Sequence, residues 1–179
     1  MINQKIYKKL EKVNLLVSDV DGVLTDGKIY ISSDGQEMKN FCVEDGTGVA
    51  LAKYGNINIA LLSGRYSKAT EIRAKELNIE QCFQGFLNKK DKFLEICRIF
   101  KEDPEDVAYI GDGIIDIPVF EIAGCSISVP NGHDTVKKRS LLITEKSGGD
   151  GVLYEVVELI LKSKNQYEEV INNMKDSVF

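Results

Sequence analysis

Residues 13–22 read Val13-Asn-Leu-Leu-Val-Ser-Asp-Val-Asp-Gly22, a short apolar run that ends in two aspartates and a glycine. A run this short and this apolar predicts a strand buried on both faces, with Asp19 and Asp21 at its carboxyl end. Three more apolar runs, at residues 57–62, 107–110 and 125–129, stop at Ser63-Gly-Arg, Gly111-Asp-Gly and Pro130-Asn-Gly. The chain therefore repeats one pattern, a buried strand followed by a polar loop.

Helical spacing of apolar residues separates these strands. The three predicted faces are Ala69, Ile72, Ala74 and Leu77; Phe93, Leu94, Cys97 and Phe100; and Val119, Phe120 and Ile122. Alternation of strands and helices predicts an α/β fold, with a Rossmann-like parallel sheet sandwiched by helices. Since such sheets bind ligands at the carboxyl ends of their strands, we expect the polar loops to converge there.

One stretch breaks the alternation. Residues 28–31 and 37–41 are strand-like and flank Ser32-Ser-Asp-Gly-Gln36, which indicates a β-hairpin. We predict a small flap over residues 27–42 and no cap domain, within a single domain over residues 1–179. Residues 163–179 form a polar tail with apolar residues at helical spacing, which favours either a frayed terminal helix or a helix docked on a neighbouring subunit.

Composition limits the function classes. The net charge of -5 argues against a nucleic-acid partner, because a phosphate backbone requires a basic surface. No apolar run approaches the roughly 20 residues of a membrane span, and the first residues do not resemble a signal peptide. The four cysteines form no C-x-x-C pair, so we expect neither a zinc site nor disulfides, but reduced thiols in a cytoplasmic protein.

The polar loops carry what the hydrolysis of a phosphate monoester requires. Asp19 can attack phosphorus and form an aspartyl-phosphate, while Asp21 can protonate the leaving oxygen and later activate water. Ser63 offers a hydroxyl to a phosphoryl oxygen, and Lys89 offers a fixed positive charge. These residue types predict a phosphatase.

Carboxylates beside a phosphate dianion repel one another, so a divalent cation is expected. Oxygen ligands favour Mg²⁺, and we predict Asp19, Asp21 and Asp112 as its ligands. Asp116, one helical turn after Asp112, is expected to orient Lys89 or a metal-bound water.

These residues resemble a known superfamily. The segments Asp19-Val-Asp-Gly-Val-Leu-Thr-Asp-Gly27, Ser63-Gly-Arg, Asn88-Lys89 and Gly111-Asp-Gly-Ile-Ile-Asp116 occur in the order of the four motifs of the haloacid dehalogenase superfamily. Within it, the flap, Phe41-x-Val43-x-Asp45-Gly46, Gln84-Gly85 and Gly148-Gly-x-Gly151 look like the phosphatases of 3-deoxy-D-manno-octulosonate 8-phosphate, over residues 15–161.

The resemblance implies a Mg²⁺-dependent enzyme that releases phosphate from an 8-phosphorylated eight-carbon sugar acid on the route to lipopolysaccharide. It implies a homotetramer in which a neighbouring subunit helps to close each site. The substrate contacts carried over are Asp21, Cys42, Val43, Glu44, Asp45, Gly46, Arg65, Arg73 and Lys89. The fork of a guanidinium suits a sugar carboxylate, which fits Arg65 and Arg73.

The chain also departs from that pattern. Glu44 and Ala50 stand where many octulosonate phosphatases have basic residues, and Gly113 replaces a second acid. One alternative is a phosphatase for nine-carbon sialic-acid-like 9-phosphates, which Arg65 disfavours and Glu44 and Ala50 favour. Another is an inactive interaction module of a sugar-nucleotide pathway, and a phosphomutase would require a cap domain.

His133 and residues 148–151 each have a structural interpretation beside a functional one. His133 has no partner nucleophile in the sequence and is expected to be a loop residue rather than part of a triad. Residues 148–151 are either a phosphate-binding nest or a loop that caps the next helix.

Overall fold

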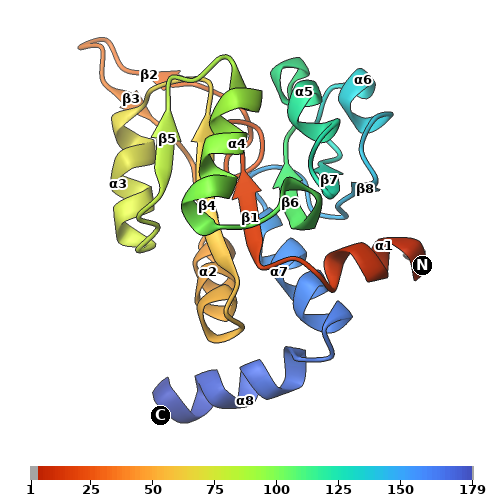
Figure 1. Ribbon diagram of the computed structural model, residues 1–179. Helices are drawn as coiled ribbons and strands as arrows, with labels where there is room; N and C mark the ends of the chain where they lie inside the picture. Colours follow the sequence, from red (N-terminus) through yellow and green to blue (C-terminus); the bar gives the residue numbers. More distant parts are fainter. Residues whose placement is uncertain (1–3, 179) are drawn as a thin grey trace.

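A parallel sheet of six strands forms the centre of the molecule (Figure 1). Its order is β5 (Cys82–Gln84), β4 (Asn58–Ser63), β1 (Leu15–Ser18), β6 (Val107–Ile110), β7 (Cys125–Ser128) and β8 (Leu142–Ile143). The computed structural model describes residues 4–178, with side chains to residue 175; residues 1–3 and 179, which the predicted domain and tail include, lie outside the described residues. The predicted parallel α/β fold is confirmed.

The central strands send alternate side chains to two separate hydrophobic layers. Leu16 and Leu61 pack into one layer, whereas Leu15, Val17 and Leu62 pack into the other. Because every residue of β1 is buried, Leu15, Leu16 and Val17 are all apolar rather than alternating with polar residues.

Helices cover both faces of the sheet. The first layer is completed by α1 (Gln4–Leu10), α2 (Glu44–Tyr54), α3 (Lys68–Glu76), α7 (Val152–Ser163) and α8 (Tyr167–Val178). The second layer is completed by α4 (Lys89–Phe100), α5 (Ile117–Phe120) and α6 (Asp134–Lys137), while residues 104–106 and 114–116 form single 3₁₀ turns. None of the helices within residues 4–178 is long and apolar enough to cross a bilayer.

The predicted face of α3 is partly wrong. Ile72 is 59% exposed, whereas Thr70 and Ala74 are buried and Leu77 is half-buried. Thr70, Ala74 and Leu77 follow one another at spacings of four and three residues, and Ile72 lies two residues from Thr70, on the opposite side of the helix.

The predicted hairpin is present and shorter than expected. β2 (Tyr30–Ile31) pairs antiparallel with β3 (Glu37–Met38), and Gly35 takes the turn at a φ of +83°. In Figure 1 the hairpin extends beyond the carboxyl ends of β1 and β4. No segment of the described chain forms a larger cap over this edge of the sheet.

The tail forms helix α8, which lies at the opposite end of the molecule from the flap (Figure 1). Val170 is 4% exposed and belongs to the hydrophobic core, and the Tyr167 hydroxyl lies 3.0 Å from the Tyr154 hydroxyl on α7. The predicted helix is therefore packed on its own chain.

Candidate active site

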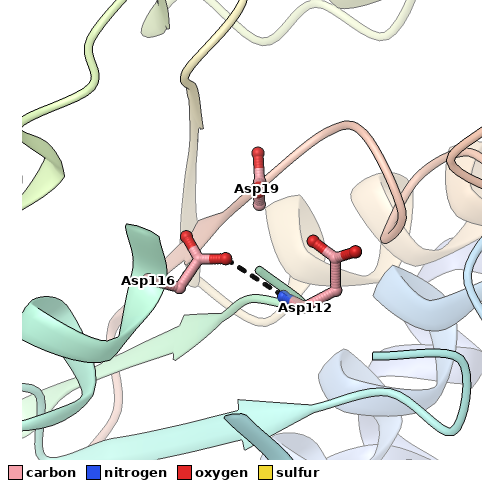
Figure 2. Close-up of side chains that lie close together, drawn as sticks. All are labelled: Asp19, Asp112 and Asp116. Atoms are coloured by element: carbon pink, nitrogen blue, oxygen red, sulfur yellow. Dashed lines mark hydrogen bonds between the residues drawn. The ribbon is translucent and has the colours of Figure 1, made fainter. Parts of the chain in front are cut away.

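Three carboxylates meet at the carboxyl edge of the sheet (Figure 2). Asp19 follows β1, Asp112 follows β6, and Asp116 ends the 3₁₀ turn beyond it. One carboxylate oxygen of each lies within 4.8 Å of the other two. Asp19 is anchored by its backbone N–H, which donates to the Ile110 carbonyl oxygen at 2.9 Å across the β1–β6 pair. Strand pairing thus brings residues 93 positions apart (19 and 112) into one cluster.

The turn after β1 requires a glycine. Gly22 has a φ of +84°, and a Cβ atom there would lie 2.0 Å from Asp112 Oδ2. Asn131, after β7, holds the same turn: its amide nitrogen donates to the Gly22 carbonyl oxygen at 2.9 Å, and its amide oxygen accepts from the Gly148 N–H at 2.6 Å. Residues 131 and 148 therefore stabilise the loop that carries Asp19 and Asp21.

Lys89 lies between two of the carboxylates. Its Nζ atom is 2.6 Å from Asp19 Oδ2 and 2.7 Å from Asp116 Oδ1, and its side chain is fully buried at the first residue of α4. A buried ammonium is tolerated only when it is paired, so the burial of Lys89 depends on the carboxylates of Asp19 and Asp116. The structure brings together predicted residues 19, 89 and 112.

Asp116 has both oxygens engaged. Oδ1 accepts from Lys89 Nζ and from the Tyr109 hydroxyl at 2.6 Å, and Oδ2 accepts from the N–H groups of Asp112 at 3.1 Å and Gly113 at 2.9 Å. With four donors around it, Asp116 is suited to orienting Lys89 rather than to binding a cation. Tyr109 has no counterpart among the predicted site residues, because it reads as one more apolar position of β6.

The electrostatics favour a cation at this cluster. The pKa of Asp112 is raised to about 6, mainly by burial and also by the charge of Asp116, while Lys89 opposes the change. Burial also raises the pKa of Asp19, against the effect of Lys89. Burial alone would lower the pKa of Lys89, yet the charges of Asp19 and Asp116 raise it overall.

The donors fit a hard divalent ion. Asp19 and Asp112 offer oxygen atoms only. Their pKa values are raised mainly by burial and also by the neighbouring carboxylates, so a bound cation would favour their ionised forms. Oxygen donors of this kind suit Mg²⁺.

Asp21 faces a different partner. Its Oδ1 atom lies 2.5 Å from Lys39 Nζ on the flap, and its carboxylate is not a member of the acidic cluster. A role of Asp21 as metal ligand therefore stays a prediction. The sequence does not single out Lys39, because one lysine in a polar hairpin has no spacing pattern that would mark it as a site residue.

Ser63 and Arg65 follow β4. Ser63 is 1% exposed, and its Oγ atom accepts from the Arg65 N–H at 3.2 Å. The Arg65 guanidinium pairs with Glu37 on the flap at 2.6 Å, with its side chain 44% exposed. Arg65 thus lies at the flap, while its contact with substrate stays a prediction.

Arg73 is largely buried rather than solvated. Its Nη2 atom donates to the Cys42 carbonyl oxygen at 2.9 Å, Nη1 pairs with Glu76 at 2.9 Å, and the guanidinium lies 5.9 Å from the centre of the Phe41 ring. Arg73 therefore fixes residues 41–42 against α3.

The next four predicted contact residues differ in exposure. Val43 is 84% exposed, and Glu44 pairs with Lys146. Asp45 is buried and accepts from the Leu153 N–H at 2.9 Å, and burial raises its pKa to about 6. Gly46 packs near Leu77, which directly follows α3. These contacts connect the segment to α3 and α7 rather than to the acidic cluster, and its role in substrate binding stays a prediction.

A cavity of about 580 Å³ opens at the opposite end of the molecule. It is lined by Ile57, by Asn58 at the start of β4, and by residues of α2, α3 and α8. It is remote from the carboxyl ends of the strands, and Gly46 is the one predicted contact residue among its lining residues.

Comparison with known proteins agrees with this geometry. Residues 59–156 match the family model of haloacid dehalogenase-like hydrolases. The 3-deoxy-D-manno-octulosonate 8-phosphate phosphatase of Salmonella typhi is 38% identical over 168 residues, covering 94% of this chain and 89% of that protein.

Solved structures agree as well. The Moraxella catarrhalis 3-deoxy-D-manno-octulosonate 8-phosphate phosphatase, in complex with magnesium, phosphate and the sugar acid KDO, has a TM-score of 0.91 and 39% identity, covering 94% of this chain and 97% of that one. The cobalt-bound Haemophilus influenzae deoxy-D-mannose-octulosonate 8-phosphate phosphatase has a TM-score of 0.85 and 33% identity, covering 89% and 93%. Since the family model spans more than half of the chain and the relatives align along nearly all of it, the chain belongs to the haloacid dehalogenase-like hydrolases.

Proposed function

We propose that this protein is a Mg²⁺-dependent phosphatase that hydrolyses 3-deoxy-D-manno-octulosonate 8-phosphate to the sugar acid and phosphate. The observation that carries the proposal is the cluster of buried Asp19, buried Lys89 and half-buried Asp112 at the edge of the sheet. The relatives that share this fold at 36–39% identity are named as phosphatases of that compound, and one of them holds magnesium, phosphate and the sugar acid.

Asp19 is the nucleophile in this proposal. One of its oxygens attacks phosphorus, the bond to the leaving oxygen breaks, and an aspartyl-phosphate forms. Lys89 holds Oδ2 of Asp19 at 2.6 Å and places a positive charge beside the phosphoryl oxygens, and the Ser63 hydroxyl lies at the end of the adjacent strand to bind another of them. Asp19 and Asp112 would hold Mg²⁺, which would supply positive charge against the carboxylates and the phosphoryl oxygens.

Asp21 handles the protons. It gives a proton to the leaving alkoxide in the first half of the reaction and takes one from the attacking water in the second, which restores Asp19 and frees phosphate. Its carboxylate is half-buried, two residues after Asp19 on the same loop. Both halves use the same side chain, so the site returns to its starting protonation.

The substrate carboxylate is assigned to the cations near the flap. Arg65 has a partly exposed guanidinium there, and Arg73 fixes the Cys42 backbone beside it. The other proposed substrate contacts are Asp21, Lys89 and the segment Cys42, Val43, Glu44, Asp45 and Gly46. Arg65 favours the eight-carbon substrate over a nine-carbon 9-phosphate. An inactive module is disfavoured, because a buried lysine between carboxylates brings no evident benefit without a reaction.

We further propose that the enzyme is a homotetramer of the cytoplasm that acts on a small molecule and binds neither nucleic acid nor membranes. All four cysteines are free thiols, as a reducing compartment would keep them. The flap exposes apolar side chains, with Ile31 at 68% and Met38 at 59%, which suits contact between subunits. Light scattering on the purified protein would give the subunit number, and a monomer would refute the tetramer.

The test is phosphate release from purified protein. With Mg²⁺, we expect steady release from 3-deoxy-D-manno-octulosonate 8-phosphate, with kcat/KM at least about tenfold above that for a nine-carbon 9-phosphate. Asp19→Asn should abolish release while keeping the fold, because the amide lacks the nucleophilic oxygen charge. Release from the 9-phosphate alone would replace the substrate assignment, and full activity of Asp19→Asn would remove the mechanism.

A further inference from the structure

Lys39 on the flap is a buried cation beside the active site. It follows β3 directly, and its side chain is fully buried. Its Nζ atom lies 2.5 Å from Asp21 Oδ1, 3.2 Å from Thr70 Oγ1 on α3, and 3.9 Å from Glu37 Oε1. One ammonium therefore joins the nucleophile loop, the flap and a helix of the main domain.

Another flap lysine shows what an ordinary surface ion pair looks like here. Lys28 lies 3.2 Å from Asp26, yet its side chain is 71% exposed. An exposed pair of that kind adds little to stability, whereas removing water from Lys39 has a large cost unless its partners are fixed. The burial of Lys39 therefore indicates a defined position for both the ammonium and the Asp21 carboxylate.

A second ion pair fixes the same flap. Glu37 on β3 pairs with Arg65 after β4 at 2.6 Å. The hairpin itself has only two paired residues on each strand, too few to be stable alone. Its placement thus depends on the charges of residues 21, 37, 39 and 65, which alternate in sign along the chain of contacts.

We propose that Lys39 is a positioning residue for Asp21, and that the flap, through Lys39, sets the direction in which Asp21 exchanges protons with the leaving group. The ammonium holds Oδ1, so Oδ2 is the oxygen that carries the transferred proton. In the first step this proton moves from Oδ2 to the leaving oxygen as the phosphorus–oxygen bond breaks and the bond to Asp19 forms. The proposal rests on the proposed phosphatase function, in which Asp21 is the general acid.

The test compares leaving groups that do and do not need a proton. We would measure kcat/KM, which reports the steps up to departure of the leaving group, for p-nitrophenyl phosphate and for a primary alkyl phosphate, the 8-phosphate above. Lys39→Met should lower the value for the alkyl phosphate about 30-fold or more and that for the aryl phosphate about threefold or less, because p-nitrophenolate leaves without protonation.

Matched variants separate positioning from folding. Lys39→Arg should recover most of the alkyl activity, and Lys28→Met, the exposed flap lysine, should leave both substrates unchanged. Thr70→Val removes only the 3.2 Å contact of the ammonium and should shift the alkyl-to-aryl ratio in the same direction by about threefold. It serves as the deciding variant if Lys39→Met does not fold, which thermal unfolding would reveal.

Equal losses on both substrates, or no loss on the alkyl phosphate, would overturn the positioning role of Lys39. The proposed function fails independently, in the wild type: absent release from the 8-phosphate removes the substrate assignment. The leaving-group ratio would then be taken with whichever alkyl phosphate the wild-type enzyme accepts.

Discussion

Tyr109 shows how a single buried hydroxyl supports the site. The residue is fully buried on β6, its ring packs edge-on against Phe93 and Phe120, and its hydroxyl donates to Asp116 at 2.6 Å. Burial raises the pKa of Tyr109 well above its ordinary value, so the hydroxyl remains a donor. It thereby helps Asp116 to hold Lys89 beside Asp19.

We predict that Tyr109→Phe lowers the free energy of unfolding by about 1.5–3 kcal/mol, since a hydrogen bond to a charged group is lost while the ring contacts remain. Activity should fall about tenfold or less, because Lys89 keeps its pair with Asp19. Chemical denaturation and steady-state kinetics check this. Tyr66→Phe, at a hydroxyl that pairs with Glu71 on the surface, is the control and should change neither value. A Tyr109→Phe protein as stable as wild type would contradict the role assigned to the hydroxyl.

His133 and Gly148 both have structural roles in loops beside the site. The ring Nδ1 of His133 accepts from the Thr135 N–H at 3.2 Å, and the backbone N–H of His133 donates to the Asp112 carbonyl oxygen at 2.9 Å. His133 is therefore a loop residue that caps α6. Gly148 lies so close to the turn after β1 that a Cβ atom there would be 1.9 Å from the Gly22 carbonyl oxygen. The contacts of Gly148 favour the structural interpretation of residues 148–151.

Helix α8 bears on whether the tail stabilises its own chain or completes the site of a neighbouring subunit. Val170 is 4% exposed and packs into the layer formed with α2 and α7. Helix α8 lies at the end of the molecule opposite the flap (Figure 1). The burial of Val170 on its own chain favours a stabilising role. The alternative, in which the tail completes a neighbouring site, depends on contacts between subunits.

We predict that Val170→Ala lowers the free energy of unfolding by about 2 kcal/mol and leaves kcat/KM for the phosphate ester unchanged, since buried methyl groups are lost far from the site. Asn173→Ala, on the exposed side of α8, is the matched control and should change neither value. Denaturant unfolding and phosphate release check both. A loss of activity at unchanged stability would instead support a tail that closes a neighbouring site.

For the whole molecule, carboxylates with raised pKa values couple stability to pH, and the acidic cluster also couples it to Mg²⁺. The pKa of Asp112 is raised in the folded protein from 3.8 to about 6, and that of Asp45 likewise to about 6. Between these values the folded state binds more protons than the unfolded state. Without a metal, these two groups therefore lower the stability as pH rises through this window, and the effect is complete above about pH 6.

Mg²⁺ should act in the opposite direction. Because the cation binds the ionised forms of Asp19 and Asp112, whose pKa values are both raised, its apparent affinity should rise with pH, and Asp112 contributes up to about tenfold per pH unit below about pH 6. The increase in melting temperature caused by Mg²⁺ should therefore be larger at pH 7 than at pH 5. Thermal unfolding with Mg²⁺ or with a chelator measures this. Asp112→Asn is the control and should show a small increase at both pH values. A pH-independent increase in the wild type would rule out Asp112 as a ligand.

The sequence by itself determined the order of the elements and the chemistry at their ends. Apolar runs that stop at charged residues are local patterns, and parallel strands must align their carboxyl ends, so the convergence of Asp19, Lys89 and Asp112 could be predicted without coordinates. The short edge strands β5 and β8 have too few apolar residues for such a pattern, and the exposure of Ile72 depends on how α3 lies against its neighbours.

Only the tertiary structure decided which charges pair. Lys39 with Asp21, Glu37 with Arg65, and Tyr109 with Asp116 join residues on different elements, and nothing in their spacing distinguishes them from surface lysines, arginines or core aromatics. Pairing depends on which side chains are removed from water together when the sheet, the flap and the helices pack. That is a property of the folded whole, because a charge stays buried only where a partner from another segment meets it.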